Sequence, residues 1–212
     1  ERLSDWRPAS AEGLVEVTTT SAAGRAQAAT NLEWATGEPL VYAGTLSTEQ
    51  LSVDALLPES NRARTEITGR ATVEGTGTNP QTATAEATLQ LASSVLAGGA
   101  VDGMQSRVTL SEGTMSGTST ITQTTDQALQ ATWRLGSIVS EAPTLDVALR
   151  AQAFDVSDWG GPWQRTQLSG RAEAQAQLGP ASIRAGTMQL AVDSSSVTPQ
   201  SEPEEAAMPR AI

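Results

Sequence analysis

Apolar and polar residues alternate through almost the whole chain, and this pattern constrains the fold more than any other feature. Side chains of a β-strand point alternately to opposite faces, so the pattern predicts strands with one apolar and one polar face. Gly, Pro and Asn separate the runs, as expected for turns. The predicted strands are residues 13–20, 25–35, 40–47, 67–75, 82–92, 105–111, 114–122, 128–135, 145–153, 167–178 and 183–192.

Two stretches depart from this pattern. In residues 48–57 the spacing of Leu51, Ala55 and Leu56 also fits a short helix, so helix and strand both stay open there. Residues 198–212 are rich in Pro, Ser, Glu and Ala, which predicts a disordered tail or a linker.

A repeated octapeptide indicates how the strands are grouped. Residues 165–172, RTQLSGRA, nearly duplicate residues 64–71, RTEITGRA, and an apolar-acidic piece precedes each copy at 154–159 and 51–56. Such a repeat predicts a recurring supersecondary unit. We therefore divide the chain into four parts: N-terminal strands with a worn repeat that includes residues 3–6 (1–50), a β-repeat unit (51–152), the start of the next unit (153–197) and the tail (198–212).

The apolar faces of these strands are light. The chain has one Phe, one Tyr and five Trp, so its interior must be built from Ala, Val, Leu and Thr. Closed sandwiches and barrels usually hold larger residues, so a thin interior indicates a narrow solenoid or a channel that a ligand occupies. Strands spaced about 4.8 Å apart would extend over roughly 50 Å. The expected fold is therefore all-β, with an elongated repetitive sheet.

Composition removes several function classes. The formal net charge is −11, and the chain contains no Lys, His or Cys. Nucleic-acid binding needs a basic surface, which this composition does not provide. Without His, Cys and Lys there is no Ser-His-Asp triad, thiol nucleophile, zinc cluster or P-loop. Asp155 and Asp158 could ligate Ca²⁺, but two solvated turn acids are the simpler interpretation. We expect no enzyme activity, cofactor or metal.

The sequence also bears on membrane-spanning segments and on the extent of the chain. No apolar run approaches the roughly 18 residues that would cross a bilayer as a helix. Because the chain begins at Glu1 in the middle of a pattern, we expect it to be a piece of a longer protein.

Several motifs together resemble the TamB/AsmA-like translocation and assembly module family. They are the apolar-acidic piece 154–159, the strand start Ser169-Gly170-Arg171, the turn Gly75-Thr76-Gly77 and the strand end 91–95. The second repeat departs from the pattern, because Ala176-Gln177-Leu178 replaces the Gly-x-Gly turn. The resemblance covers residues 51–197 best.

This resemblance implies a U-shaped, taco-like β-groove with an apolar concave face, standing in the periplasm of the cell envelope. It implies a bridge-like lipid transport role in outer-membrane biogenesis or protein secretion, with phospholipid or another lipid as the partner. An outer-membrane β-barrel assembly protein is a further expected partner. In the full-length protein an N-terminal helix would anchor the chain to the inner membrane.

The groove expected from this resemblance is lined by the apolar sides of the predicted strands, although the same residues could form a plain core. The expected lipid-facing residues are Ala85, Ala87, Leu89, Leu91, Val108, Leu110, Leu129, Trp133, Leu135, Leu145, Val147, Leu149, Leu168 and Leu190.

The five tryptophans have two expected roles. Trp6, Trp159 and Trp163 could form the rim of a lipid entrance or cap the end of a sheet, and Trp34 and Trp133 are expected in the core. The alternative function is a secreted β-solenoid of adhesin or autotransporter-passenger type. A solenoid would need a regular rung of roughly 20–30 residues, whereas the repeat here has a period near 100 residues (165 − 64 = 101).

Overall fold

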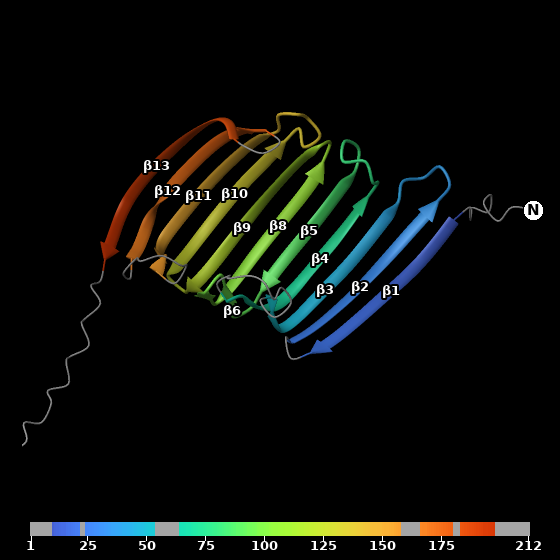
Figure 1. The fold of residues 1–212 in the computed structure, drawn as a ribbon, viewed down its shortest axis with the longest axis horizontal. Coiled ribbons are helices and arrows are strands. Elements are labelled where there is room, and N and C mark those ends of the chain that lie inside the picture. Colours follow the sequence, from blue (N-terminus) through green and yellow to red (C-terminus); the bar gives the residue numbers. More distant parts are fainter. Residues whose placement is uncertain (1–9, 22–23, 54–63, 158–165, 180–182, 198–212) are drawn as a thin grey trace, which may run out of the picture.

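The chain folds into one large, open antiparallel β-sheet (Figure 1). This computed structural model describes residues 10–21, 24–53, 64–157, 166–179 and 183–197. The sheet order is β1-β2-β3-β4-β5-β8-β9-β10-β11-β12-β13, and the short β6 and β7 pair with β4 and with each other. The strands are β1 Ser10–Ser21, β2 Gly24–Ala35, β3 Val41–Ser52, β4 Glu66–Thr76, β5 Thr84–Leu91, β6 Ser94–Leu96, β7 Gly99–Val101, β8 Gly103–Ser111, β9 Thr114–Thr124, β10 Gln127–Gly136, β11 Thr144–Asp155, β12 Thr166–Leu178 and β13 Ile183–Val197.

All eleven predicted strands are confirmed, with ends that shift by a few residues. The alternation did not predict the hairpin of β6 and β7, because strands of three residues are too short to show a period. Its turn, Ala97-Gly98, has positive φ at both residues (49° and 91°), as a two-residue hairpin turn of type I′ requires.

Residues 48–57, for which helix and strand were both left open, form a strand up to Ser52 and are helical at Val53, where the described part ends. β3 continues to Ser52, with Leu51 opposite Ile67 of β4. A β-bulge between Thr48 and Leu51 inserts one extra residue, and Gln50 adopts a φ of 48°. The extra residue breaks the period of two at this point of the strand. Residues 54–57 lie outside the described part of the chain, as do Trp6, Trp159, Trp163, the worn repeat at 3–6 and the tail 198–212.

The two octapeptide copies build the same local structure. In the first, the N–H of Gln50 at the bulge of β3 donates to Thr68 Oγ1 at 3.0 Å. In the second, the N–H of Ala153 at the bulge of β11 donates to Ser169 Oγ at 2.9 Å. Ala153 also has a positive φ, of 45°. The hydroxyl residue of the repeat therefore satisfies the N–H that a bulge leaves without a ladder partner.

At the other end of the repeat unit, both copies also form the same backbone hydrogen bond, although the sequence differs there. Gly77 N–H donates to Leu40 C=O at 2.7 Å, and Leu178 N–H donates to Pro143 C=O at 2.8 Å. The substitution of Ala176-Gln177-Leu178 for the Gly-x-Gly turn thus preserves the closing hydrogen bond. The unit boundaries predicted after residues 50 and 152 fall inside β3 and β11, at the two bulges.

Removing the bulge hydrogen bond should destabilise the sheet measurably. We expect Ser169→Ala to lower the free energy of unfolding by about 1 kcal/mol, the net value of a typical intramolecular hydrogen bond. Ser169→Thr should keep stability within about 0.5 kcal/mol, because the first copy uses Thr68 at the same place. Urea unfolding followed by far-UV circular dichroism measures both values. Equal stabilities for the Ala and Thr variants would show that the hydroxyl does not hold the bulge.

Little apolar surface is buried in this single layer. Among the described residues, the hydrophobic ones that are buried are Ala83, Leu91, Val101 and Phe154. Large apolar side chains on the strands remain open, with Leu46 43% and Leu149 38% exposed. The described strands form one antiparallel sheet rather than the stacked parallel rungs of a β-solenoid.

Candidate functional site

The register of the strands places the expected groove residues on one side of the sheet. Residues directly opposite each other in neighbouring strands share a face. One cross-strand row runs from Leu46 through Leu89 and Ala131 to Leu149 and Leu190. All fourteen residues expected from the sequence lie on this side, which we call the apolar face.

The apolar face extends beyond the predicted residues in both directions. Its further members, which the sequence analysis did not select, are Val15, Val17, Ala28, Leu32, Leu46, Ala71, Val73, Met104, Met115, Ile121, Ala131, Ala172, Ala174 and Met188. The same alternation that identified the first set could have found these, since they occupy the apolar positions of predicted strands.

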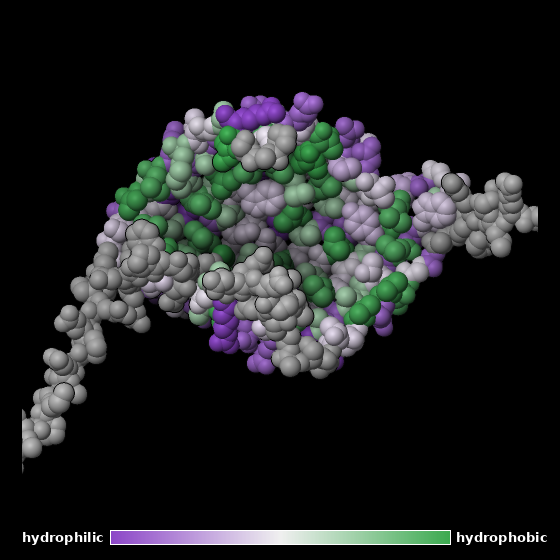
Figure 2. All heavy atoms as spheres, viewed as in Figure 1, coloured by the Kyte–Doolittle hydropathy of each residue, from purple (hydrophilic) through white to green (hydrophobic). Residues whose placement is uncertain are grey.

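None of the paired strand positions on the apolar face carries a charged side chain, in the part of the chain that the structure describes. Figure 2 shows hydrophobic side chains on this side of the sheet, with polar residues gathered toward its outer rims. A charge-free surface across eleven strands suits an uncharged, apolar contact, because an unpaired charge is costly to remove from water.

Side-chain size varies in a regular way across the middle of this face. β8 presents Met104, Ser106, Val108 and Leu110 in order along the strand. β9 presents Met115, Gly117, Ser119 and Ile121, which lie opposite them in reverse order. Large residues therefore lie near the strand ends and small ones in the middle.

Two aromatic side chains lie over glycines of this face. A Cβ placed on Gly117 would come within 2.7 Å of the Trp133 indole, and one on Gly75 within 2.5 Å of the Tyr42 hydroxyl. Each ring thus covers the backbone of the neighbouring strand where a side chain is missing. Trp133, expected in a core, instead lies half-buried on the apolar face of a single-layered sheet. Trp34 is half-buried as well.

Both faces of the sheet contain an open pocket. The pocket on the apolar face has a volume of about 510 Å³ and is lined by β2 to β8, including Leu46, Val73, Leu89 and Ser106. A larger one, of about 640 Å³, lies on the opposite face over β8 to β13, where Arg107, Arg134, Asp146 and Glu173 line it. Pocket volume alone therefore does not decide which face binds a ligand. The chemical character of the two faces has to decide it.

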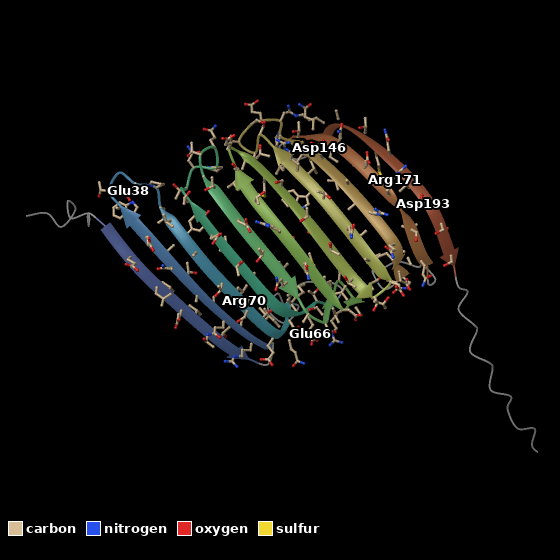
Figure 3. All side chains as sticks on the ribbon, turned by 180° about the vertical axis from the view of Figure 1, so that it is seen from behind. Glu38, Glu66, Arg70, Asp146, Arg171 and Asp193 are labelled. Carbon is tan, nitrogen blue, oxygen red and sulfur yellow. The ribbon has the colours of Figure 1, made fainter. Side chains whose placement is uncertain are left out.

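The opposite face is polar and charged. Figure 3 shows it from behind, with Arg70, Asp146 and Arg171 among its labelled side chains. Arg107 Nη2 lies 2.6 Å from Glu86 Oε2, in a pair whose side chains are 64% and 34% exposed. The hydrogen bond to Glu86, and then the charge of Glu86, raise the pKa of Arg107 above its ordinary value. An exposed pair of this kind contributes little to stability.

Metal chemistry finds no support in the described residues. They contain no group of three or more His, Cys, Asp or Glu that could hold a metal ion. Asp155 Oδ1 accepts hydrogen bonds from the backbone N–H of Ser157 at 2.9 Å and from its hydroxyl at 2.7 Å, which is an ordinary turn arrangement. Asp158 lies outside the described part of the chain.

Within the described ranges, no helix has the length and apolar character needed to cross a bilayer.

Comparisons with known proteins add no family to this description. No protein-family model matches the chain, and no match was found among curated proteins or solved structures. The function must therefore be inferred from the two faces of the sheet.

Proposed function

We propose that this chain is a segment of a cell-envelope protein that shields the acyl chains of lipids on its apolar face. The observation that carries the proposal is an eleven-strand surface without a charged side chain, on which Leu46, Val73 and Leu149 are each about 40% exposed. Monomeric proteins rarely leave a contiguous apolar surface of this extent to water, and such surfaces mark contact sites.

The energetics of lipid movement match such a surface. Each CH₂ group transferred from water to an apolar environment contributes about 0.8 kcal/mol. An acyl chain of roughly 16 carbons therefore faces a barrier of about 10 kcal/mol to enter water. A continuous apolar face removes most of this barrier. Small side chains in the middle of β8 and β9 leave room for the acyl chain, and a curved sheet would complete a U-shaped groove with an apolar concave side.

The polar rims of the same face suit lipid headgroups, which stay in water while the acyl chains are covered (Figure 2). Lipid transport involves no chemical step, so the protein would act as a carrier and not as an enzyme. Bridge-like transport needs no specific pocket, because lipids pass along the face in a row.

The resemblance of the repeat to the TamB/AsmA-like family supports the wider setting. In that setting the segment stands in the periplasm, belongs to a protein anchored in the inner membrane and takes part in outer-membrane biogenesis. Phospholipid is then the natural cargo, and an outer-membrane β-barrel assembly protein is the natural protein partner. The adhesin alternative is less well supported, because its rungs would enclose the apolar residues that are exposed here.

Lipid carriage can be tested directly on the purified chain. We expect protein prepared without detergent to contain phospholipid in native mass spectra and solvent extracts, and to take up a fluorescent phospholipid from vesicles. A folded protein that contains no lipid and takes up none would contradict the proposal. Such a result would favour a surface that binds another protein.

A further inference from the structure

One polar feature interrupts the middle of the apolar face. Ser106 of β8 and Ser119 of β9 lie directly opposite each other, and their hydroxyl oxygens are 2.8 Å apart. Leu89 and Ala131 continue the same row on either side. Both serines are half-buried, and the positions around them on this face carry no charge.

Hydroxyl pairs across strands are common in this protein, but the others lie on the polar face. Thr72 pairs with Thr88 at 2.7 Å, Thr76 with Thr84 at 2.9 Å, and Thr109 with Ser116 at 2.9 Å. On that face, water can satisfy whatever hydrogen-bonding capacity a pair leaves over. The Ser106–Ser119 pair has the same geometry in a different environment.

Counting protons shows what this pair lacks. Two hydroxyls carry two protons, and the bond between them uses one. Within the described part of the chain, neither serine makes a further hydrogen bond. The second proton is therefore available to an acceptor that approaches the apolar face. Once an acyl chain covers this position and excludes water, a donor without an acceptor becomes unfavourable.

Position and charge restrict the chemistry of that acceptor. Ser106 lines the pocket of about 510 Å³ together with Leu46, Ala71, Leu89 and Val108. Apolar pockets commonly orient their ligands through a few polar groups of this kind. A carboxylate or phosphate would be buried here without a cation, which is costly. An uncharged carbonyl oxygen has no such cost.

We propose that the Ser106–Ser119 pair donates a hydrogen bond to the ester carbonyl oxygen of a bound acyl lipid, and so selects esters over ethers. The inference rests on the proposed function and narrows its cargo to acyl esters. The ester lies at the border between the acyl chain and the headgroup. The position of the ester at the serine pair would fix how far the acyl chain extends along the cross-strand row.

Two lysolipids that differ in one group test this selection. They are 1-palmitoyl-lysophosphatidylcholine and its 1-hexadecyl ether analogue, which lacks the carbonyl oxygen. We expect the full chain to bind the ester about five- to tenfold more tightly, the value of one net hydrogen bond. Titration below the micellar concentration, followed by displacement of a fluorescent fatty acyl probe, measures both dissociation constants. In the Ser106→Ala/Ser119→Ala variant the two lipids should bind equally.

A matched pair on the other face provides the control. Thr109→Val/Ser116→Ala removes a hydroxyl pair of similar length from the polar face and should leave the preference for the ester unchanged. Two results would overturn this inference and leave lipid carriage intact. They are equal binding of both lipids by the wild type, and an ester preference that survives in the Ser106→Ala/Ser119→Ala variant. If the wild type binds neither lipid, lipid carriage itself fails.

Discussion

Phospholipid uptake should fall at least a hundredfold when Leu46 and Leu149 are both replaced by Asp. These residues lie on β3 and β11, at separate places in one cross-strand row of the apolar face. A carboxylate at either place must leave water without a partner when an acyl chain covers it. That transfer costs several kcal/mol in proteins, and about 1.4 kcal/mol corresponds to a factor of ten in affinity.

Both positions tolerate a charge in the absence of lipid, because their side chains are 43% and 38% exposed. Loss of uptake should therefore occur in a folded protein, with an unchanged circular dichroism spectrum. We expect Leu46→Asn/Leu149→Asn to show a smaller defect, since an amide is polar but carries no charge. This ordering, Leu above Asn above Asp, separates the loss of apolar contact from the added cost of a charge.

The polar face provides the matched control for this prediction. Ser47→Asp/Thr132→Asp adds the same charge on strands β3 and β10, at exposed positions on the opposite side of the sheet. Uptake should stay within about twofold of the wild type, corresponding to at most about 0.5 kcal/mol. If the two charged variants lost uptake equally, net charge rather than the apolar face would be responsible.

The sequence predicted the strands and their faces well, because both depend on local alternation. Thr84, Glu86 and Thr88 alternate with Ala85, Ala87 and Leu89, and no other regular structure separates these two sets so cleanly. The all-β class and the common side of the fourteen expected residues therefore followed from the sequence before any tertiary information. The bulges did not, since one inserted residue at Gln50 shifts the register without an obvious sequence signal.

The pairing of the strands could not be predicted from the sequence, and neither could the contact between Ser106 and Ser119. Ser106 and Ser119 are both ordinary small residues within alternating runs. Only the β8–β9 register places their hydroxyls 2.8 Å apart. The hairpin turn at Glu112-Gly113, with φ of 49° and 71°, sets this register. A one-residue slip would move one of the two serines to the polar face.

The octapeptide repeat was visible from the sequence, but its physical meaning was not. Its hydroxyl residue binds the bulge N–H, and its glycine allows the next strand to approach closely. The same Gly-Arg-Ala sequence occurs a third time at Gly24, whose added Cβ would collide with the Gln50 carbonyl of β3. This third occurrence lies at the start of β2, and it is a clearer internal match than the worn copy expected at residues 3–6.

Replacing the repeat glycines with alanine should destabilise the sheet, and the size of the effect should depend on the neighbouring strand. A Cβ at Gly69 would overlap the Gln90 carbonyl oxygen of β5, and a Cβ at Gly170 would lie 2.5 Å from the Ala191 carbonyl oxygen of β13. We expect Gly69→Ala to lower the free energy of unfolding by about 3 kcal/mol, the upper range for overpacking. Urea unfolding monitored by tryptophan fluorescence measures this loss.

Gly170→Ala should cost less, about 1–2 kcal/mol, because β13 is an edge strand that can move away, whereas β5 is held between β4 and β8. Gly13→Ala on β1 is the control, since nothing lies within 4 Å of its added Cβ. It should leave stability unchanged or raise it by up to about 0.5 kcal/mol through the reduced entropy of the unfolded chain. Equal losses at all three glycines would mean that backbone flexibility, and not strand approach, explains glycine in the repeat.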